Sequence, residues 1–372
     1  MKIALLTIHW ANNYGASLQT FATVKALEKY GQVTVLDYRS KYAAKGMQLI
    51  RWGLSPRDIL RIGKDLFRLI PRYRAIRAFR EFTFNRLDLS EELCSDDDFS
   101  SVASEFDLFV CGSDQIWNPD IVSETGEIDE YYFLKFAEGK PRISYASSMG
   151  THRFTAAKKD QVGRLLSGFS AISVREKDSA DYLGSIMARD VTAVMDPTLL
   201  LGHSEWLEAF AIDSGDTADE PFILVYALKK DRNLKVVVEF YRKKLGLKIV
   251  CIDQDPFLNY KPDVHLKHAS PEEFVQLFHQ ADFIITNSFH GTCFSVLFNK
   301  SFVVCEPPSG KNRIMNLLSI VGLSGRFVSA DRLEVNAEAD WATVNKLLAY
   351  AVNESFSYLD RSIVAEIDEV VV

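Results

Sequence analysis

The sequence has no long apolar run, few cysteines and no excess of basic charge, and each absence excludes a class of protein. No stretch approaches the roughly 18 consecutive apolar residues that a membrane-spanning helix needs. The five cysteines have no CxxC spacing, which argues against a zinc or disulfide framework and indicates reduced thiols in a cytoplasmic protein. A net charge of −7 gives a nucleic-acid partner no electrostatic support.

A dinucleotide-binding fingerprint is also absent. Residues 2–8 are too short an apolar run for a signal peptide and are soon followed by polar residues, so we predict an opening strand. The loop after it reads Asn12-Asn13-Tyr14-Gly15, which is not GxGxxG. Side-chain amides and backbone N–H groups at a helix start suit a sugar hydroxyl, a carboxylate or a phosphate. A plain helix-capping loop explains the same residues equally well.

The sequence does contain the alternation of strand and helix patterns that is typical of α/β proteins. At 372 residues, with 47% hydrophobic and 25% charged residues, the chain has a globular composition and enough length for two domains. Strand–loop–helix–strand patterns of the Rossmann type recur in both halves. We expect a first domain over 1–205, a second over 220–340, and two C-terminal helices within 341–372.

The clearest candidate site lies in residues 281–298. A strand-like apolar run ends there in polar residues, and His290 and Gly291 then open a segment with helical spacing. Ligands bind outside the carboxyl ends of parallel strands, and a helix N-terminus favours an anion. His290 would contact such a ligand, and Gly291 would let it approach the backbone closely. The alternative is a helix capped by Asn287 or Ser288, with His290 in a solvated loop.

Two strand ends in the first half also carry polar residues. One runs into Gly-Ser-Asp-Gln at 112–115, where Asp114 would orient a sugar hydroxyl or act as a base, or would only form a turn. The other leads to Arg175, which would bind a carboxylate or phosphate with two hydrogen bonds. The alternative for Arg175 is a salt bridge with Glu176 or Asp178.

Two further patterns bear on ion binding. Lys311 and Arg313 lie beside the start of a predicted helix and form a second candidate anion site. Asp253 and Asp255 resemble a DxD metal motif, but a three-residue pattern is weak and a loop of solvated acids explains it better. We therefore predict no metal site.

Residues 51–86, within an insert at about 41–90, differ from the rest of the chain. They hold ten Arg or Lys residues against three Asp or Glu, interleaved with apolar residues. A locally basic amphipathic segment in a chain of net charge −7 fits a helix pair lying on anionic lipid. The alternative is a helical hairpin packed on the domain with its basic face solvated.

Six short motifs occur in an order that resembles the polysaccharide pyruvyl transferase family. They extend over about residues 1–320, and the insert lies outside the resemblance. Each motif alone is weak, but six in the right order are fairly specific. The motifs are Asn13-Tyr14-Gly15-Ala16 with Leu18-Gln19, Gly112-Ser113-Asp114-Gln115 with Trp117-Asn118, Ser144-Tyr145-Ala146-Ser147-Ser148, Ser173-Val174-Arg175-Glu176, Met195-Asp196-Pro197-Thr198, and Thr286-Asn287-Ser288-Phe289-His290-Gly291-Thr292.

The resemblance implies an α/β fold with two Rossmann-like domains facing each other across a cleft, as in GT-B enzymes. It also implies transfer of pyruvate from phosphoenolpyruvate to two hydroxyls of a sugar, which gives a cyclic ketal and phosphate. The acceptor is expected to be a sugar of a capsule, exopolysaccharide or cell-wall polymer, often still lipid-linked. Phosphoenolpyruvate is a co-substrate, and no cofactor is expected.

Residue roles follow from the same resemblance. His290 matches an acid/base residue, and Arg175 matches an Arg that would hold phosphoenolpyruvate. Many members carry an Arg where this chain has Ser288, so a second cation for the trianionic donor must come from elsewhere, and we expect Arg313 or Lys311. The alternative is that the donor differs. Asp114 would take the proton of the attacking hydroxyl. The other expected donor-binding residues are Ser288, Gly291 and Thr292, and the expected acceptor-binding residues are Asn12, Asn13, Tyr14, Gly15, Ser113, Gln115, Trp117 and Asn118.

Two alternatives of different classes remain open. A GT-B-type glycosyltransferase would bind a nucleotide sugar, although the second half has no clear pair of Glu and basic residue after a Gly-rich loop. A non-catalytic sugar-binding protein would bind the acceptor without donor turnover, which the polar strand ends in both halves argue against. The expected location is the cytoplasm, peripherally on the inner face of the plasma membrane, with no nucleic-acid partner.

Overall fold

In the computed structural model the chain divides into two compact units. Unit 1 comprises residues 1–47, 83–200 and 350–372, and unit 2 comprises residues 48–82 and 201–349. The insert therefore contributes residues 48–82 to unit 2, although the sequence places it inside the first domain. The structure describes residues 1–40, 42–52, 56–307, 310–335 and 338–370, without the side chains of 43, 56–60 and 365–370.

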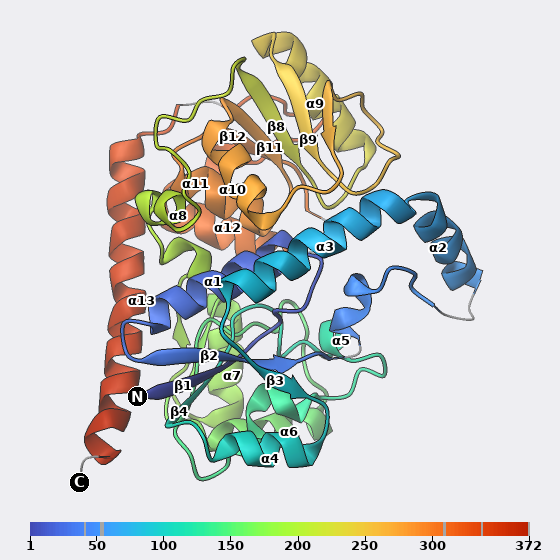
Figure 1. Cartoon of the computed structure of the whole chain (residues 1–372). Helices are drawn as coiled ribbons and strands as arrows, with labels where there is room; N and C mark the ends of the chain where they lie inside the picture. The colour runs from blue at the N-terminus through green and yellow to red at the C-terminus, as the bar shows by residue number, and fades with distance from the viewer. Residues whose placement is uncertain (41, 53–55, 308–309, 336–337, 371–372) are drawn as a thin grey trace. The chain divides into compact units, whose positions relative to one another are not determined.

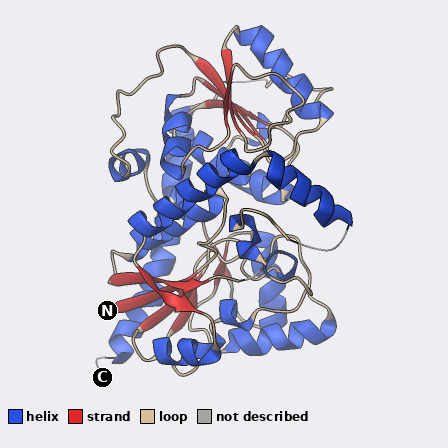
Figure 2. Ribbon diagram, turned by 45° about the vertical axis from the view of Figure 1, so that its right-hand side comes forward, coloured by secondary structure: helices blue, strands red, loops and turns tan. Residues whose placement is uncertain are grey.

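Unit 1 is built on a five-stranded parallel sheet with the order β3-β2-β1-β4-β5 (Figure 1). A two-stranded pair, β6 and β7, lies outside this sheet. Figure 2 shows helices on both faces of the main sheet. The strands are β1 (Lys2–Leu6), β2 (Gln32–Tyr38), β3 (Leu89–Leu93), β4 (Leu108–Cys111), β5 (Arg142–Ser144), β6 (Ser173–Val174) and β7 (Thr192–Ala193), and the helices are α1 (Tyr14–Leu27), α4 (Asp96–Ala103), α5 (Pro119–Val122), α6 (Ala156–Ser167) and α7 (Lys177–Met187).

Unit 2 repeats the same topology. Its parallel sheet has the order β10-β9-β8-β11-β12. In each unit the first strand of the sheet therefore lies in the middle, the second and third strands are added on one side of it, and the fourth and fifth are added on the other side. This is the strand order of half a doubly wound fold. The strands are β8 (Phe222–Tyr226), β9 (Lys248–Ile252), β10 (Val264–Leu266), β11 (Phe283–Thr286) and β12 (Ser301–Val304). The helices are α2 (Pro56–Phe67), α3 (Leu69–Arg86, of which residues 83–86 belong to unit 1), α8 (His203–Ala209), α9 (Arg232–Leu245), α10 (Pro271–Gln280), α11 (Phe289–Leu297) and α12 (Lys311–Ile320).

The central strands form because their residues are apolar on both faces. In β1, Ile3 to Leu6 are fully buried, as are Ile284 and Ile285 of β11, which is expected for parallel strands covered by helices on both sides. The predicted capping box of α10 is present, with the Ser270 hydroxyl accepting from the backbone N–H of Glu273 at 3.1 Å. All five cysteines are free thiols, and four of them are buried.

The C-terminal segment is one helix, α13 (Trp341–Val370), so the prediction of two helices is wrong. The segment contains no Gly or Pro, and nothing in it interrupts the backbone hydrogen bonding. Its polar Ser355 is buried, and the hydroxyl accepts from the backbone N–H of Met195 at 2.9 Å. None of the helices in the described part of the chain is long and apolar enough to cross a bilayer.

The insert forms two helices, α2 and α3, joined at a bend. Pro71 lies in the first turn of α3 and cannot donate a hydrogen bond to the carbonyl of Phe67, which explains the break between the helices. On the inner side of the bend the fully buried Asp65 accepts from Arg51 at 2.6 Å and from Arg68 at 3.1 Å. Arg72 lies 4.0 Å from the same carboxylate. Several of the basic residues of the insert therefore hold the helix pair together.

We expect Asp65→Asn to lower the free energy of unfolding of unit 2 by about 2–4 kcal/mol, since three buried or half-buried guanidinium groups would lose their counter-charge. Urea unfolding followed by tryptophan fluorescence measures this. Glu81→Gln is the matched control, because it breaks the solvent-exposed pair with Arg77 and should leave the unfolding midpoint unchanged.

The same pair has a predictable pH dependence. Burial raises the pKa of Asp65, but the hydrogen bonds and charge of Arg51, with Arg68, outweigh it and lower the pKa to about 2. The stabilisation is therefore complete above about pH 4, the ordinary pKa of Asp, and is lost as the pH falls toward 2. Equal stability of wild type and Asp65→Asn at pH 7 would contradict the assignment.

Candidate active site

The Ser-Phe-His-Gly segment of unit 2 is a strand end that turns directly into a helix. β11 ends at Thr286, and Ser288 is the N-cap of α11, its hydroxyl accepting from the backbone N–H of Gly291 at 3.3 Å. The hydroxyl of Thr292 donates to the Ser288 carbonyl at 2.9 Å. His290 is thereby fixed as the second residue of α11, at the carboxyl edge of the sheet, and its side chain is only partly buried.

Gly291 is required by close packing between α11 and β11. A Cβ at this position would lie 2.3 Å from the Thr286 hydroxyl and 3.2 Å from the Tyr226 ring. The Thr286 hydroxyl itself donates to the Tyr226 carbonyl at 2.7 Å and accepts from the Ser288 N–H at 3.0 Å. Gly291 therefore positions the helix start through its lack of a side chain.

The remaining polar residues of this segment are used in building it. Asn287 is buried; its carbonyl oxygen accepts from the Leu228 N–H at 2.7 Å and its amide donates to the Lys229 carbonyl at 2.8 Å, which fixes the loop after β8. Ser288 and Thr292 are buried and hold the turn. The predicted contacts of Ser288 and Thr292 with phosphoenolpyruvate stay predictions.

Of the two basic residues predicted near this site, Arg313 lies beside the His290 segment. Its guanidinium carbon is 5.6 Å from the centre of the Phe289 ring, and that ring lies 5.2 Å from the imidazole of His290. Gly310 has a φ of +69°, and a Cβ there would meet the Arg313 guanidinium at 2.5 Å. Lys311 instead pairs with Glu306 at 2.9 Å on an exposed surface.

In unit 1 the predicted residues Asp114 and Arg175 are brought together. They follow β4 and β6, and Arg175 Nη2 lies 3.6 Å from Asp114 Oδ1. Arg175 also donates to Asp196 at 2.7 Å and lies 3.4 Å from Glu176. Among these acids Asp114 has the most exposed side chain, at 18%, and it also accepts from the Gln115 N–H at 2.8 Å.

Arg175 is almost completely buried, with only 2% of its side chain exposed. Burial alone lowers the pKa of the guanidinium, but the charges of Glu176, Asp196 and Asp114 outweigh it and raise the pKa above its ordinary value. One of these partners is Glu176, with which a salt bridge was the expected alternative role of Arg175. These surroundings let Arg175 orient the Asp114 carboxylate, and the donor contact by Arg175 stays a prediction.

The predicted acceptor-binding residues divide into two groups. Asn12, Asn13 and Gln115 are partly or fully exposed near the carboxyl edge of the sheet, and Asn13 caps α1 by accepting from the Ala16 N–H at 3.2 Å. The others are buried: Tyr14, Gly15, Ser113, Trp117 and Asn118. The Trp117 indole donates to the Tyr132 carbonyl at 3.0 Å and its ring stacks on Phe133, which places Trp117 in the core of unit 1, and its contact with the sugar acceptor stays a prediction.

Sequence reasoning missed a buried pair at the ends of β1 and β2. His9 Nε2 lies 3.0 Å from Asp37 Oδ1, and Arg39 bonds both oxygens of the same carboxylate. Burial raises the pKa of Asp37, but the bonds from His9 and Arg39 outweigh it and lower the pKa. Arg39 also packs on the Trp10 ring at 3.9 Å, so the pair fixes the start of the loop before α1. The sequence signal for this pair was the polar His9 directly after the apolar run of the first strand.

The residues Asp253 and Asp255 do not form a metal site in the described structure. Asp253 pairs with Lys230 at 2.7 Å, and Asp255 pairs with Lys64 at 2.5 Å. Across the described residues, no group of three or more His, Cys, Asp or Glu side chains is arranged to hold a metal ion.

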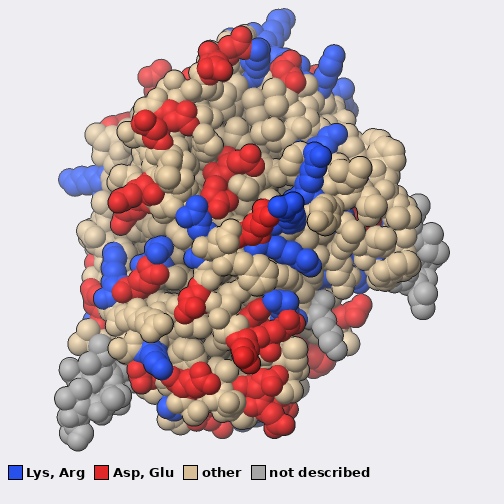
Figure 3. Space-filling model, viewed as in Figure 1, with Lys and Arg blue, Asp and Glu red and all other residues tan. Residues whose placement is uncertain are grey.

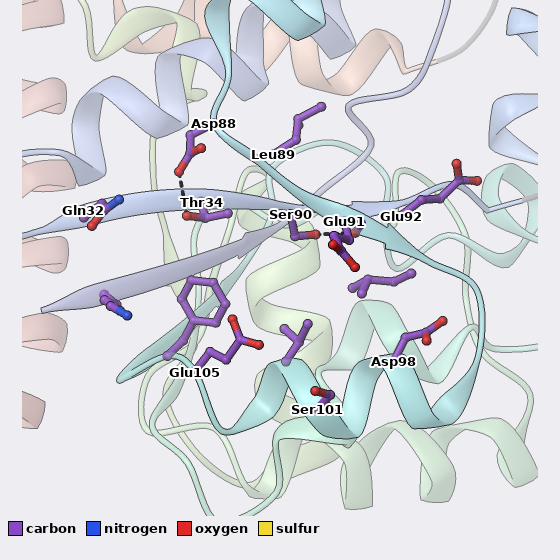
Figure 4. Close-up of a pocket in the computed structure, with 14 residues that line it drawn as sticks. Gln32, Thr34, Asp88, Leu89, Ser90, Glu91, Glu92, Asp98, Ser101 and Glu105 are labelled. Carbon is purple, nitrogen blue, oxygen red and sulfur yellow. Dashed lines mark hydrogen bonds between the residues drawn. The ribbon is translucent and has the colours of Figure 1, made fainter.

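A hollow of about 590 Å³ lies at the β3 edge of unit 1, beside α4 (Figure 4). Its wall carries five acidic residues, and it includes none of the predicted site residues. A site for a trianionic donor needs positive charge, so this acidic hollow is not a candidate for the donor. The acidic residues are Asp88, Glu91, Glu92, Asp98 and Glu105.

Solved structures identify the fold class. The UDP-GlcNAc 2-epimerase from Neisseria meningitidis bound to UDP-GlcNAc is similar with a TM-score of 0.54 and 11% identity, over 98% of this chain and 100% of that chain. The UDP-GlcNAc 2-epimerase from Methanocaldococcus jannaschii is similar with a TM-score of 0.50 and 10% identity, over 95% and 93%. At these identities the likeness concerns the fold, which is of the GT-B class, as predicted.

The family follows from the sequence itself. The model of the polysaccharide pyruvyl transferase family matches residues 13–309, which is most of the chain. This protein therefore belongs to the polysaccharide pyruvyl transferase family, and the resemblance seen in its motifs is confirmed. Among curated protein sequences no significant match was found.

The burial of Arg175 leads to a first test of the site. Arg175→Met should lower the free energy of unfolding of unit 1 by about 3–5 kcal/mol, because it leaves three carboxylates close together without a counter-charge. Denaturant unfolding measures the loss. Arg313→Ala, which removes a half-buried guanidinium in unit 2, should cost much less. A fully stable Arg175→Met protein would contradict the structural role.

Proposed function

We propose that this protein transfers pyruvate from phosphoenolpyruvate onto two hydroxyls of a sugar, forming a cyclic ketal and releasing phosphate. The observation that carries the proposal is the construction of the α11 N-terminus. Within a pyruvyl transferase family member, Thr286, Ser288 and Gly291 together position one partly exposed histidine, and an arginine lies beside it.

The chemistry needs a proton donor, a proton acceptor and positive charge. A proton is added to the methylene carbon of phosphoenolpyruvate, which leaves an oxocarbenium-like centre at the neighbouring carbon. The first sugar hydroxyl attacks that carbon and loses its proton. Phosphate then leaves with its bonding electron pair, and the second hydroxyl closes the ketal. Of the two hydroxyl protons, one restores the acid and the other leaves with phosphate.

We assign proton donation to His290, because imidazole can gain and lose a proton near neutral pH. The donor's carboxylate and phosphate would be held by the Arg313 guanidinium together with the positive end of the α11 dipole. Phe289, between Arg313 and His290, supports both side chains. Arg313 would thereby supply the positive charge that many family members have from an Arg at the position of Ser288.

The proton acceptor is proposed to be Asp114 of unit 1. Its carboxylate is oriented by Arg175 and the Gln115 N–H and is the most exposed of the acids around Arg175. Arg175 acts here as a positioning residue. Asn12, Asn13 and Gln115, which are not fully buried, are the remaining candidates for contacts with the sugar hydroxyls.

The acceptor is proposed to be a lipid-linked or polymer-precursor sugar of a bacterial surface polysaccharide. The protein would then work in the cytoplasm at the inner face of the plasma membrane. No cofactor or metal is part of the scheme. The second candidate function is that of an enzyme acting on a nucleotide sugar, because a solved structure of similar fold contains bound UDP-GlcNAc. Nucleotide binding would distinguish this candidate from the pyruvyl transferase.

Calorimetric titration with phosphoenolpyruvate is the first test. Arg313→Ala should weaken donor binding by about 10–100-fold, since it removes a charge-assisted contact. Arg332→Ala, an exposed arginine of the same unit, is the matched control and should bind like wild type. Tight binding of UDP or UDP-sugars with no phosphoenolpyruvate signal would reject the donor and favour the glycosyltransferase.

His290→Asn tests the chemical step. Phosphate release from phosphoenolpyruvate, measured with a panel of sugar acceptors, should fall by about 10²–10⁴-fold, whereas donor affinity should change only a few-fold. Loss of donor binding together with turnover would show that His290 is a ligand contact and not the acid. Wild-type turnover in this variant would reject the role altogether.

A further inference from the structure

The bend between α2 and α3 has charged groups inside and large apolar groups outside. Asp65 is fully buried and gathers Arg51, Arg68 and Arg72 beneath the surface. On the outer side, Phe67 is 70% exposed and Ile70 is 66% exposed. This is the reverse of the distribution expected where a helix pair faces water.

The outer side forms a patch that we call the apolar elbow. Arg51 bonds Asp65 through its side chain and its backbone N–H, which brings the neighbouring Trp52 to the bend with 70% of its surface exposed. Phe67 stacks on Phe257 with ring centres 5.6 Å apart, and both are exposed. The apolar elbow consists of Trp52, Leu66, Phe67, Leu69, Ile70, Tyr73 and Phe257.

Exposed basic residues follow the apolar elbow along the same helix. Going along α3 from Tyr73, the side chains of Arg74, Arg77 and Arg80 are exposed. In Figure 3 the surface over the bend is mainly tan, with blue side chains close by. Arg74, Arg77 and Arg80 add positive charge to the exposed surface of a chain whose net charge is −7, so this surface complements an anionic partner.

We propose that the apolar elbow inserts into the interface of an anionic lipid bilayer, with the α3 arginines on the headgroups. Trp and Tyr favour the boundary between headgroups and acyl chains, and arginine reaches from an apolar surface to the phosphates. An exposed patch of this kind is uncommon on a protein surrounded by water. The inference names the surface at which the proposed transferase meets a lipid-linked acceptor, and to that extent it rests on the proposed function.

Vesicle binding by the full-length protein tests the proposal without donor or acceptor, so it can fail independently of the pyruvyl transfer. Co-sedimentation is measured with phosphatidylcholine vesicles containing about one-third phosphatidylglycerol. Phe67→Ser/Ile70→Ser should weaken partitioning at least about ten-fold, because two exposed apolar side chains no longer enter the lipid. Tyr350→Ser/Val364→Ser, which removes two exposed apolar side chains of α13, is the matched control and should bind like wild type.

Two further variants separate insertion from simple charge attraction. Arg74→Gln/Arg77→Gln should weaken binding to the anionic vesicles and lower the dependence of binding on the lipid's charge, because two cationic side chains no longer contact the headgroups. Quenching of tryptophan emission by lipids brominated on their acyl chains should occur in wild type and be lost in Trp52→Phe. Binding that is lost in the arginine variant but intact in Phe67→Ser/Ile70→Ser would overturn insertion.

A second copy of the chain is the competing occupant of the apolar elbow. Sedimentation velocity distinguishes it: a wild-type dimer that becomes monomeric in Phe67→Ser/Ile70→Ser, together with absence of vesicle binding, would assign the patch to self-association. A monomeric wild type that does not bind anionic vesicles would also overturn the proposal.

Discussion

The close contact between α11 and β11 is the constraint on which the candidate site of unit 2 depends. The Thr286 hydroxyl holds the Tyr226 carbonyl and the Ser288 N–H, and it occupies the space that a side chain at Gly291 would fill. With the helix held this close, Ser288 can cap it and His290 is fixed in the first turn. A parallel sheet with a helix after each strand brings such turns to one edge, where ligands bind. The main role of the Ser-Phe-His-Gly segment is therefore to position the imidazole of His290.

Two buried charge clusters mirror each other in the two units. In unit 1 one guanidinium, that of Arg175, faces three carboxylates, whereas in unit 2 one carboxylate, that of Asp65, faces three guanidinium groups. The first cluster orients the Asp114 carboxylate at the carboxyl edge of its sheet, and the second fixes the α2–α3 bend beneath the apolar elbow.

The sequence predicted the parts of this structure that depend on local pattern. Apolar runs such as Phe283 to Ile285 indicate strands, and Ser270 with Glu273 indicates a helix start, because burial and capping need only neighbouring residues. The partners of single polar side chains could not be predicted in this way. Arg175 donates to Asp196, the Trp117 indole donates to the carbonyl of Tyr132, and Lys311 pairs with Glu306. No spacing rule shows which of two basic residues finds a carboxylate, so Lys311 and Arg313 could not be separated before the fold was known.

The division between supporting and reacting groups explains why each motif contains more polar residues than its chemistry uses. A hydroxyl or amide at a strand end must be satisfied once buried, and Asn287, Ser288 and Thr292 meet that need by bonding the backbone around them. A side chain whose donor and acceptor groups already bond the backbone has few hydrogen-bonding groups available for a substrate. The residues able to act are those that the turn leaves partly exposed, and in the two best-defined motifs these are His290 and Asp114. Exposure at a rigid strand end is thus a better guide to the reacting group than polarity alone.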